Sequence, residues 1–105
     1  MMFAVLLTRE AQADLDRLFE FVLVRELALD GGNLDLADEA LAAIRAGLSS
    51  LERFPFICRK ATDSAFLREL IIPFGHTGYV ALFEVLDGKT VVVAAVRHQR
   101  EDDDR

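Results

Sequence analysis

The sequence predicts a single α+β domain in which a short strand and a helical hairpin precede an antiparallel sheet. Apolar residues recur at helical spacing through the first half of the chain, and from Phe66 onward the period changes to two. No internal repeat or linker divides the 105 residues. We therefore expect one domain over residues 1–105, with a short acidic tail from about residue 99.

Residues 3–7 are the first apolar run, which is too short for a helix and predicts a buried strand. Thr8 is the expected N-cap of a helix that continues to about Leu29. The residues that line one face of this helix are Ala11, Leu15, Leu18, Phe19 and Val22. The apolar stripe is wide, so the helix should touch the sheet and also a second helix or a partner chain. The residues that widen it are Phe21, Leu23, Val24 and Leu27.

The segment Asp30-Gly31-Gly32-Asn33 is expected to end this helix, because paired glycines supply the positive φ of a C-cap. A second helix begins near Asp35. It has the clearest amphipathic pattern of the chain, with apolar residues at Ala37, Leu41, Ile44, Leu48 and Leu51. Two helices joined by a short glycine loop predict an antiparallel helical hairpin.

Residues 66–72, 79–86 and 89–97 are rich in β-branched, aromatic and aliphatic side chains and predict a three-stranded antiparallel meander. Asp87-Gly88 predicts a two-residue type I′ turn between the last two strands. In that register Val85 faces Thr90 and Tyr79 faces Val96, so Tyr79 and His98 are diagonal neighbours on one face. The residues on the other face are Val91, Val93, Ala95 and Arg97.

Composition and charge exclude several classes of protein. Hydrophobic residues make up 52% of the chain and charged residues 29%, which is too apolar for a disordered chain and too charged for a membrane protein. The net charge of −6 argues against non-specific nucleic-acid binding. Residues 53–100 carry seven bases against four acids, so an anionic partner should bind there. The bases concerned are Arg53, Arg59, Lys60, Arg68, Arg97 and Arg100, although a solvated basic edge is the simpler interpretation.

No export signal is visible at the N-terminus, and we expect a cytoplasmic protein. The single cysteine, Cys58, excludes an internal disulfide and a thiolate metal cluster within one chain. The sequence has no pair of histidines at metal-ligand spacing, no phosphate-binding glycine loop and no dinucleotide fingerprint. We therefore expect neither a metal nor an organic cofactor.

Two residues are candidates for chemistry, and Arg68 is the better one. The other is His98, because it lies in the run Arg97-His98-Gln99-Arg100 after an apolar strand. A histidine exchanges protons near neutral pH, and arginines stabilise charge on phosphate oxygens. The alternative is a histidine packed beside Tyr79 at the end of a strand. Arg68 interrupts a core-like strand and must reach the rim of the sheet or a carboxylate.

The order of elements and several short motifs resemble the RelE/ParE superfamily of toxins from type II toxin-antitoxin modules, also called plasmid stabilisation proteins. The resemblance covers nearly the whole chain, and the closing run is most similar to the ParE side. The motifs are Ala11 with Asp14-Leu15, Leu51 to Pro55, Leu67-Arg68, Pro73-Phe74-Gly75, Gly78-Tyr79 and Ala95 to Glu101.

The resemblance implies a small toxin that arrests growth when its antitoxin is degraded. ParE-like members poison DNA gyrase and need no catalytic residue. RelE-like members are endoribonucleases that cut messenger RNA on the ribosome. For them Arg68 and Arg97 match positions that often hold arginine, and His98 falls near a terminal acid/base position, so these three would be the catalytic residues of a ribonuclease. The tail after Arg100 and the net charge depart from the RelE pattern, so the ParE-like interpretation comes first. A third alternative is an inactive homologue that only binds the antitoxin.

The resemblance also implies a hetero-oligomer with a ParD-like antitoxin and no sequence-specific contact with nucleic acid. We expect the antitoxin to cover the wide stripe of the first helix at Phe21, Val24 and Leu27. The residues that we expect to contact the target are Arg68, Tyr79, Arg97, His98 and Arg100.

Overall fold

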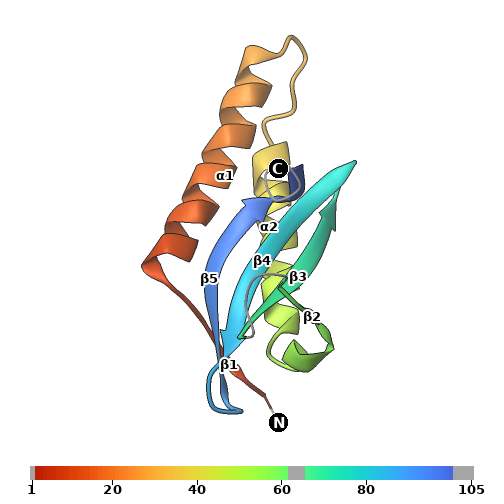
Figure 1. The fold of residues 1–105 in the computed structure, drawn as a ribbon. Coiled ribbons are helices and arrows are strands. Elements are labelled where there is room, and N and C mark those ends of the chain that lie inside the picture. Colours follow the sequence, from red (N-terminus) through yellow and green to blue (C-terminus); the bar gives the residue numbers. More distant parts are fainter. Residues whose placement is uncertain (1, 62–65, 101–105) are drawn as a thin grey trace.

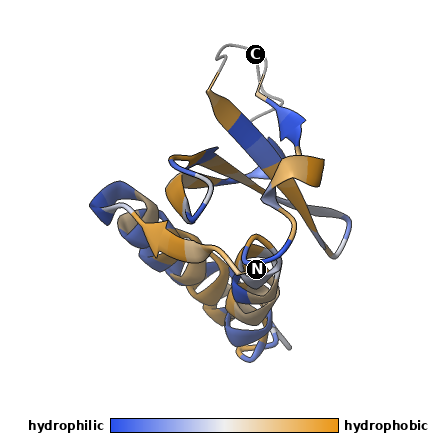
Figure 2. Cartoon of the chain, turned by 90° about the horizontal axis from the view of Figure 1, so that it is seen from below, coloured by the Kyte–Doolittle hydropathy of each residue, from blue (hydrophilic) through white to orange (hydrophobic). Residues whose placement is uncertain are grey.

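Two helices pack on one face of a five-stranded mixed sheet in the computed structural model, which describes residues 2–61 and 66–100 (Figure 1). Seen from below, the helices lie together on one side of the sheet (Figure 2). The elements in chain order are β1 (Ala4–Leu7), α1 (Arg9–Ala28), α2 (Leu36–Ser50), the 3₁₀ turn η1 (Pro55–Ile57), β2 (Arg59–Lys60), β3 (Leu67–Phe74), β4 (Thr77–Val85) and β5 (Thr90–His98).

The sheet contains the predicted meander of β3, β4 and β5, but it is larger than predicted. Its strand order is β1-β5-β4-β3-β2, in which β1 runs parallel to β5 and the other neighbours are antiparallel. Parallel neighbours need a long crossover, and the helical hairpin supplies it between β1 and the meander. The strand β2 has only two residues, so it leaves no periodic signal in the sequence.

The first strand is an edge strand, and the prediction that it is buried is wrong. Val5 and Leu7 point toward the core, while Leu6 is half exposed. This alternation is the period of two that a strand adopts when only one of its faces is covered. An apolar run of five residues hides that period because both of its faces carry apolar side chains.

Helix α1 begins as predicted, because the hydroxyl of Thr8 accepts a hydrogen bond from the N–H of Ala11 at 3.0 Å. The helix ends at Ala28, and the two glycines that follow act differently. Gly31 has a φ of +76°, as the turn requires. Gly32 provides space, since a Cβ there would lie 2.0 Å from the carbonyl oxygen of Glu26.

The core lies between the helical hairpin and the sheet. Helix α2 approaches β3 closely at Gly47, where a Cβ would lie 2.8 Å from the side chain of Ile72. The fully or nearly buried apolar residues include Ala11, Leu15 and Leu18 of α1, Ala40, Ile44 and Leu48 of α2, and Ile72, Phe83, Val91, Val93 and Val96 of the sheet. Burial of this apolar surface is the main force that holds the two layers together.

The turn between β4 and β5 is longer than predicted. The N–H of Leu86 donates to the carbonyl of Thr90 at 2.9 Å, so three residues lie between these hydrogen-bonded residues where two were predicted, and Val85 pairs with Val91. Asp87 lacks the positive φ of a type I′ turn, and its carboxylate accepts hydrogen bonds from the N–H groups of Lys89 and Thr90. An aspartate can close a turn with its own side chain, which is why the predicted turn and register are wrong.

A bulge then shifts β5 by one further residue. Phe83 pairs with Val93 but Leu82 pairs with Ala95, so Ala94 is the extra residue. The bulge reverses the alternation of side chains. Val91 and Val93 are therefore buried on the helix side, and the prediction that they share a face with Arg97 is wrong. The predicted common face of Tyr79 and His98 is confirmed, because the two residues are direct cross-strand partners.

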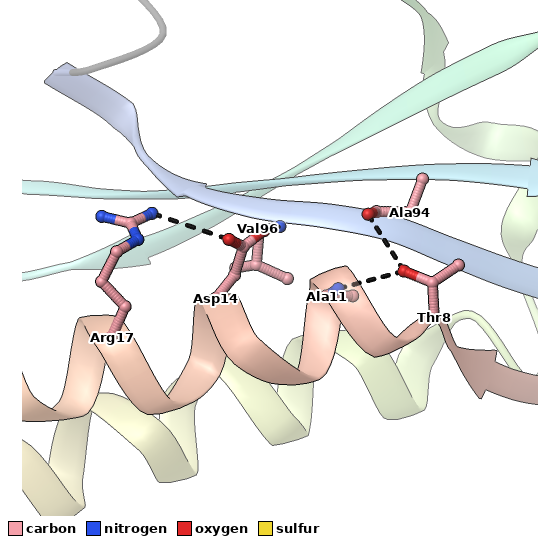
Figure 3. A network of polar contacts seen from close by, with 6 residues as sticks. All are labelled: Thr8, Ala11, Asp14, Arg17, Ala94 and Val96. Carbon is pink, nitrogen blue, oxygen red and sulfur yellow. Dashed lines mark hydrogen bonds and ion pairs between the residues drawn. The ribbon is translucent and has the colours of Figure 1, made fainter.

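Helix α1 covers the edge of β5 where β1 has ended (Figure 3). The hydroxyl of Thr8 donates to the carbonyl of Ala94 at 3.2 Å, and the carboxylate of Asp14 accepts the N–H of Val96 at 2.9 Å. Buried backbone groups that lack a partner cost about 1–3 kcal/mol each. These two side chains therefore take the place of a longer β1.

Replacing Asp14 by alanine should lower the free energy of unfolding by about 1–3 kcal/mol, because the N–H of Val96 loses its acceptor. Asp14→Asn keeps a carbonyl oxygen and should cost less. Asp16→Ala removes an exposed carboxylate from the same helix and is the control. Urea unfolding followed by circular dichroism measures the difference, and equal unfolding midpoints for the Asp14→Ala and Asp16→Ala variants would contradict the assigned contact.

Candidate interaction surfaces

His98 ends β5, and its ring is held by neighbours within the chain. Nδ1 accepts the N–H of Arg100 at 3.1 Å, Nε2 lies 3.1 Å from the hydroxyl of Thr77, and the ring of Tyr79 packs edge-on at 5.6 Å. Nδ1 therefore acts as an acceptor for the backbone, and Nε2 faces the hydroxyl of Thr77. Both nitrogens of His98 are thus occupied by internal partners.

Tyr79 is 3% exposed and lies in the core rather than at the surface. Burial raises the pKa of its hydroxyl. Its ring packs against Phe74 and His98. Tyr79 was expected to contact the target, but its buried side chain offers almost no surface for a direct contact and packs instead beside His98.

Arg68 reaches the rim of the sheet, as expected of a base in a core strand. Its Nη1 donates to the carbonyl of Cys58 at 2.9 Å, and its guanidinium lies 5.4 Å from the centre of the Phe56 ring. Arg68 therefore fastens the η1 turn to β3. Burial raises the pKa of the Cys58 thiol, and the charge of Arg68 opposes this effect.

Arg68, Arg97 and His98 are not brought together. Arg68 lies opposite Phe83 and Arg97 opposite Val80, which are positions of opposite parity on β4, so the two arginines project to opposite faces of the sheet. His98 shares the face of Arg68 but pairs with Tyr79. The partners of Arg68 and His98 on β4, Phe83 and Tyr79, are four positions apart, or roughly 13 Å along the strand.

Arg97 and Arg100 are both exposed near the end of β5. They lie beside His98 in sequence, and the N–H of Arg100 is held by its ring. His76, the other histidine, is exposed in the turn between β3 and β4. Residues 101–105, the rest of the predicted acidic tail, lie outside the described residues.

The wide stripe of α1 remains uncovered. We call Phe21, Val24 and Leu27 the α1 surface; their exposed fractions are 59%, 57% and 62%. An open cleft of about 480 Å³ runs along it, lined by Arg17, Glu20, Phe21, Val24 and Arg25. Contiguous exposed apolar surface of this kind marks interaction sites. The sheet and α2 pack against the opposite side of α1, and the α1 surface stays exposed among the described residues.

Glu26 holds the helical hairpin closed beside the α1 surface. It is 8% exposed, and its carboxylate accepts the N–H of Asn33 at 2.9 Å and a hydrogen bond from the side chain of Arg25. The hydrogen bond from Asn33 lowers the pKa of Glu26 below its ordinary value of 4.5; burial opposes this shift and Arg25 adds to it. The charged form of the Glu26 carboxylate therefore stabilises the folded conformation of the loop between α1 and α2.

A second exposed apolar region was not predicted. Phe54, Phe56 and Ile57 of the η1 turn project to solvent, and basic residues flank them on both sides. Exposed aromatic residues interleaved with Arg53, Arg59 and Lys60 are a signal that the sequence contains. It was missed because the position of Pro55 after the second helix indicated only a helix end.

Among the described residues, no helix is long and apolar enough to cross a membrane, and no cluster of His, Cys, Asp and Glu has the arrangement of a metal site. The described residues form an α+β fold that exposes apolar and basic side chains. Exposed apolar surface of this kind is typical of proteins that bind other macromolecules.

The chain matches the family model of the ParE toxin of type II toxin-antitoxin systems, parDE, over residues 5–103. It belongs to this family. Among solved structures it resembles a chain of the chromosomal ParDE toxin-antitoxin system from P. aeruginosa, with a TM-score of 0.72 and 22% identity over 92% of this chain and 96% of that one. At this identity the likeness shows the fold. No curated protein matches the sequence.

The Glu26 contact predicts a pH-dependent stability. A lowered pKa stabilises the folded state above the unfolded value of about 4.5, and the stabilisation is lost as the pH falls through the folded value. Glu26→Gln should therefore unfold at less urea than wild type at pH 7, and the difference should shrink toward pH 3. Glu20→Gln, at an exposed position of the same helix, should match wild type at pH 7. A Glu26→Gln difference that is constant from pH 7 to pH 3 would contradict the assignment.

Proposed function

We propose that this chain is the toxin of a type II toxin-antitoxin module, that it arrests growth by poisoning DNA gyrase, and that a cognate ParD-like antitoxin neutralises it. Membership in the ParE toxin family supports the toxin role. The observation that favours gyrase over messenger RNA is that the three candidate catalytic residues are not assembled. Arg68 and Arg97 lie on opposite faces of the sheet, and both nitrogens of His98 have partners within the chain. A protein that acts by binding needs no assembled catalytic cluster.

The α1 surface is the proposed antitoxin site. Covering three large apolar side chains that are more than half exposed stabilises a complex by the hydrophobic effect. Arg17, Glu20 and Arg25 border the cleft and supply polar partners of both signs. A segment of the antitoxin with an apolar face fits such a surface, whether it is helical or extended.

Arg97 and Arg100 are the proposed target contacts near the end of β5, since both are exposed bases. His98 acts as a positioning residue, because its ring holds the N–H of Arg100. Arg68 and Tyr79 contribute to target binding only through the residues that they hold in place. The basic end of the chain is then compatible with an acidic overall charge, because the target is a protein-DNA complex.

Controlled induction in a bacterial host tests the target. We expect DNA synthesis, followed by thymidine incorporation, to fall early while methionine incorporation continues in the same culture. Co-expression of the antitoxin should restore DNA synthesis. Early loss of translation with cleaved messages would overturn the gyrase proposal in favour of a ribonuclease, and growth without any arrest would leave an inactive antitoxin-binding homologue.

Val24→Asp tests the antitoxin site. A charge in the middle of the α1 surface should weaken binding of the antitoxin at least about tenfold, because a buried unpaired carboxylate is costly. Leu86→Asp is the matched control, since Leu86 is equally exposed at 57% but lies at the turn between β4 and β5. Calorimetric titration of each purified variant with the antitoxin measures the affinities. Equal affinities for both variants would place the antitoxin elsewhere.

A further inference from the structure

The end of the molecule formed by η1, β2 and the start of β3 carries the most exposed apolar side chains of the described chain. We call Arg53, Phe54, Phe56, Ile57 and Lys60 the η1–β2 corner. Ile57 is 81% exposed, and Phe54 and Phe56 are 56% and 58% exposed. Phe66, at the start of β3, is 74% exposed. Large apolar side chains that cluster at the surface mark a site for another macromolecule.

The charge at this corner is uniform. Every charged side chain among the described residues from 53 to 68 is basic, although the whole chain carries −6. Arg59 forms an ion pair with Glu69, and Arg68 is bound to Cys58 and Phe56. Arg53 and Lys60 are exposed at the two ends of the corner. An acidic partner is thus favoured at this position of an otherwise acidic molecule.

The backbone of β2 is also open on one side. The N–H of Ala61 donates to the carbonyl of Leu67, so alternation along the antiparallel pair directs the N–H and C=O of Lys60 away from β3. The described sheet has no strand beyond β2. An outward N–H and C=O on an edge strand can pair with the backbone of an extended polypeptide.

Contacts within the chain hold the turn of the corner in place. Pro55 is buried, Phe3 packs edge-on against Phe56 at 5.8 Å, and Arg68 ties the turn to β3. The exposed side chains of Phe54 and Ile57 therefore lie on a turn that these contacts hold against β3 and the N-terminal segment. A surface that is ordered in advance loses less conformational entropy when it binds.

We propose that the η1–β2 corner binds an extended segment of the toxin's target protein that carries apolar side chains next to aspartate or glutamate, and that this segment pairs with the edge of β2. The proposal rests on the proposed function that the chain acts on a protein target. The corner lies at the opposite end of the molecule from the tip of the helical hairpin (Figure 1), and the longest dimension of the chain is 48 Å. A target segment can therefore bind here while the α1 surface remains free for the antitoxin.

Single-stranded nucleic acid is the competing occupant, because bases stack on exposed aromatic rings. Three observations favour a polypeptide. Ile57, the most exposed residue of the corner, offers no ring for stacking. Two of the four bases in the region are engaged within the chain. The open edge of β2 recognises a peptide backbone and not a phosphate.

Binding of the purified full-length chain to purified DNA gyrase, and to labelled ten-residue peptides, tests the proposal. One peptide alternates leucine and phenylalanine with aspartate, a second replaces aspartate by lysine, and a third is the acidic peptide with alternate N-methylated residues. Oligothymidylate is the nucleic-acid probe. We expect the acidic peptide to bind at least about tenfold more tightly than the other three probes, and Ile57→Asp to weaken both the peptide and gyrase at least about tenfold.

The Ile57→Asp variant is compared with Val24→Asp, which changes the other exposed surface. Ile57→Asp should keep wild-type affinity for the antitoxin, which also shows that it is folded, and Val24→Asp should keep wild-type affinity for gyrase. Lys60→Glu should weaken the acidic peptide and strengthen the lysine peptide. This variant tests the charge argument without altering apolar surface.

The outcomes distinguish a failure of the proposed η1–β2 binding surface from a failure of the gyrase proposal. Wild-type affinity of the folded Ile57→Asp variant for both gyrase and the acidic peptide overturns the proposal while leaving the gyrase function intact. Tighter binding of oligothymidylate than of any peptide also overturns it. If the acidic peptide binds and Ile57→Asp abolishes that binding, but wild type does not bind gyrase, the surface is supported and gyrase is rejected as the target.

Discussion

The contact between helix α1 and the unpaired edge of β5 is the constraint on which the other features of this molecule depend. Strand β1 ends at Leu7, and β5 continues past it with backbone groups that need partners. The side chains of Thr8 and Asp14 supply them. Because Thr8 also caps the helix, the same residue fixes where α1 begins and how it lies on the sheet. The apolar positions of α1 then face the core, and Phe21, Val24 and Leu27 face outward.

The bulge at Ala94 lies at the same place and decides what the end of β5 offers. One extra residue reverses the alternation, so Val91, Val93 and Val96 all reach the core and Arg97 faces away from the helices. His98 returns to the helix side, where Tyr79, Thr77 and the N–H of Arg100 surround its ring. His98 and Arg97, which are neighbours in the sequence, thus lie on opposite faces of the sheet. These bases therefore do not form one cluster on the sheet.

The two exposed apolar regions differ in character, as two different partners would require. The α1 surface is a helical face bordered by charges of both signs. The η1–β2 corner is a turn with basic flanks beside an open strand edge. Each region exposes apolar side chains that the rest of the described chain does not cover, and burial of these side chains by a partner would stabilise a complex. A toxin that must bind an antitoxin and a target needs such uncovered surfaces, and their separation lets the affinities for the two partners change independently.

The sequence by itself determined the elements, because helix caps, amphipathic spacing and alternation act over a few residues. The Thr8 cap, the stripe of α2 and the meander follow from that local chemistry. The width of the apolar stripe on α1 also follows, but whether a second helix or a partner chain meets Phe21, Val24 and Leu27 did not, and the structure leaves all three exposed. Only the tertiary structure decided the parallel pairing of β1, the short strand β2, the bulge at Ala94 and the separation of Arg68 from Arg97. These features depend on hydrogen bonds between residues such as Asp14 and Val96, which are 82 positions apart, and no local pattern encodes a partner at that distance.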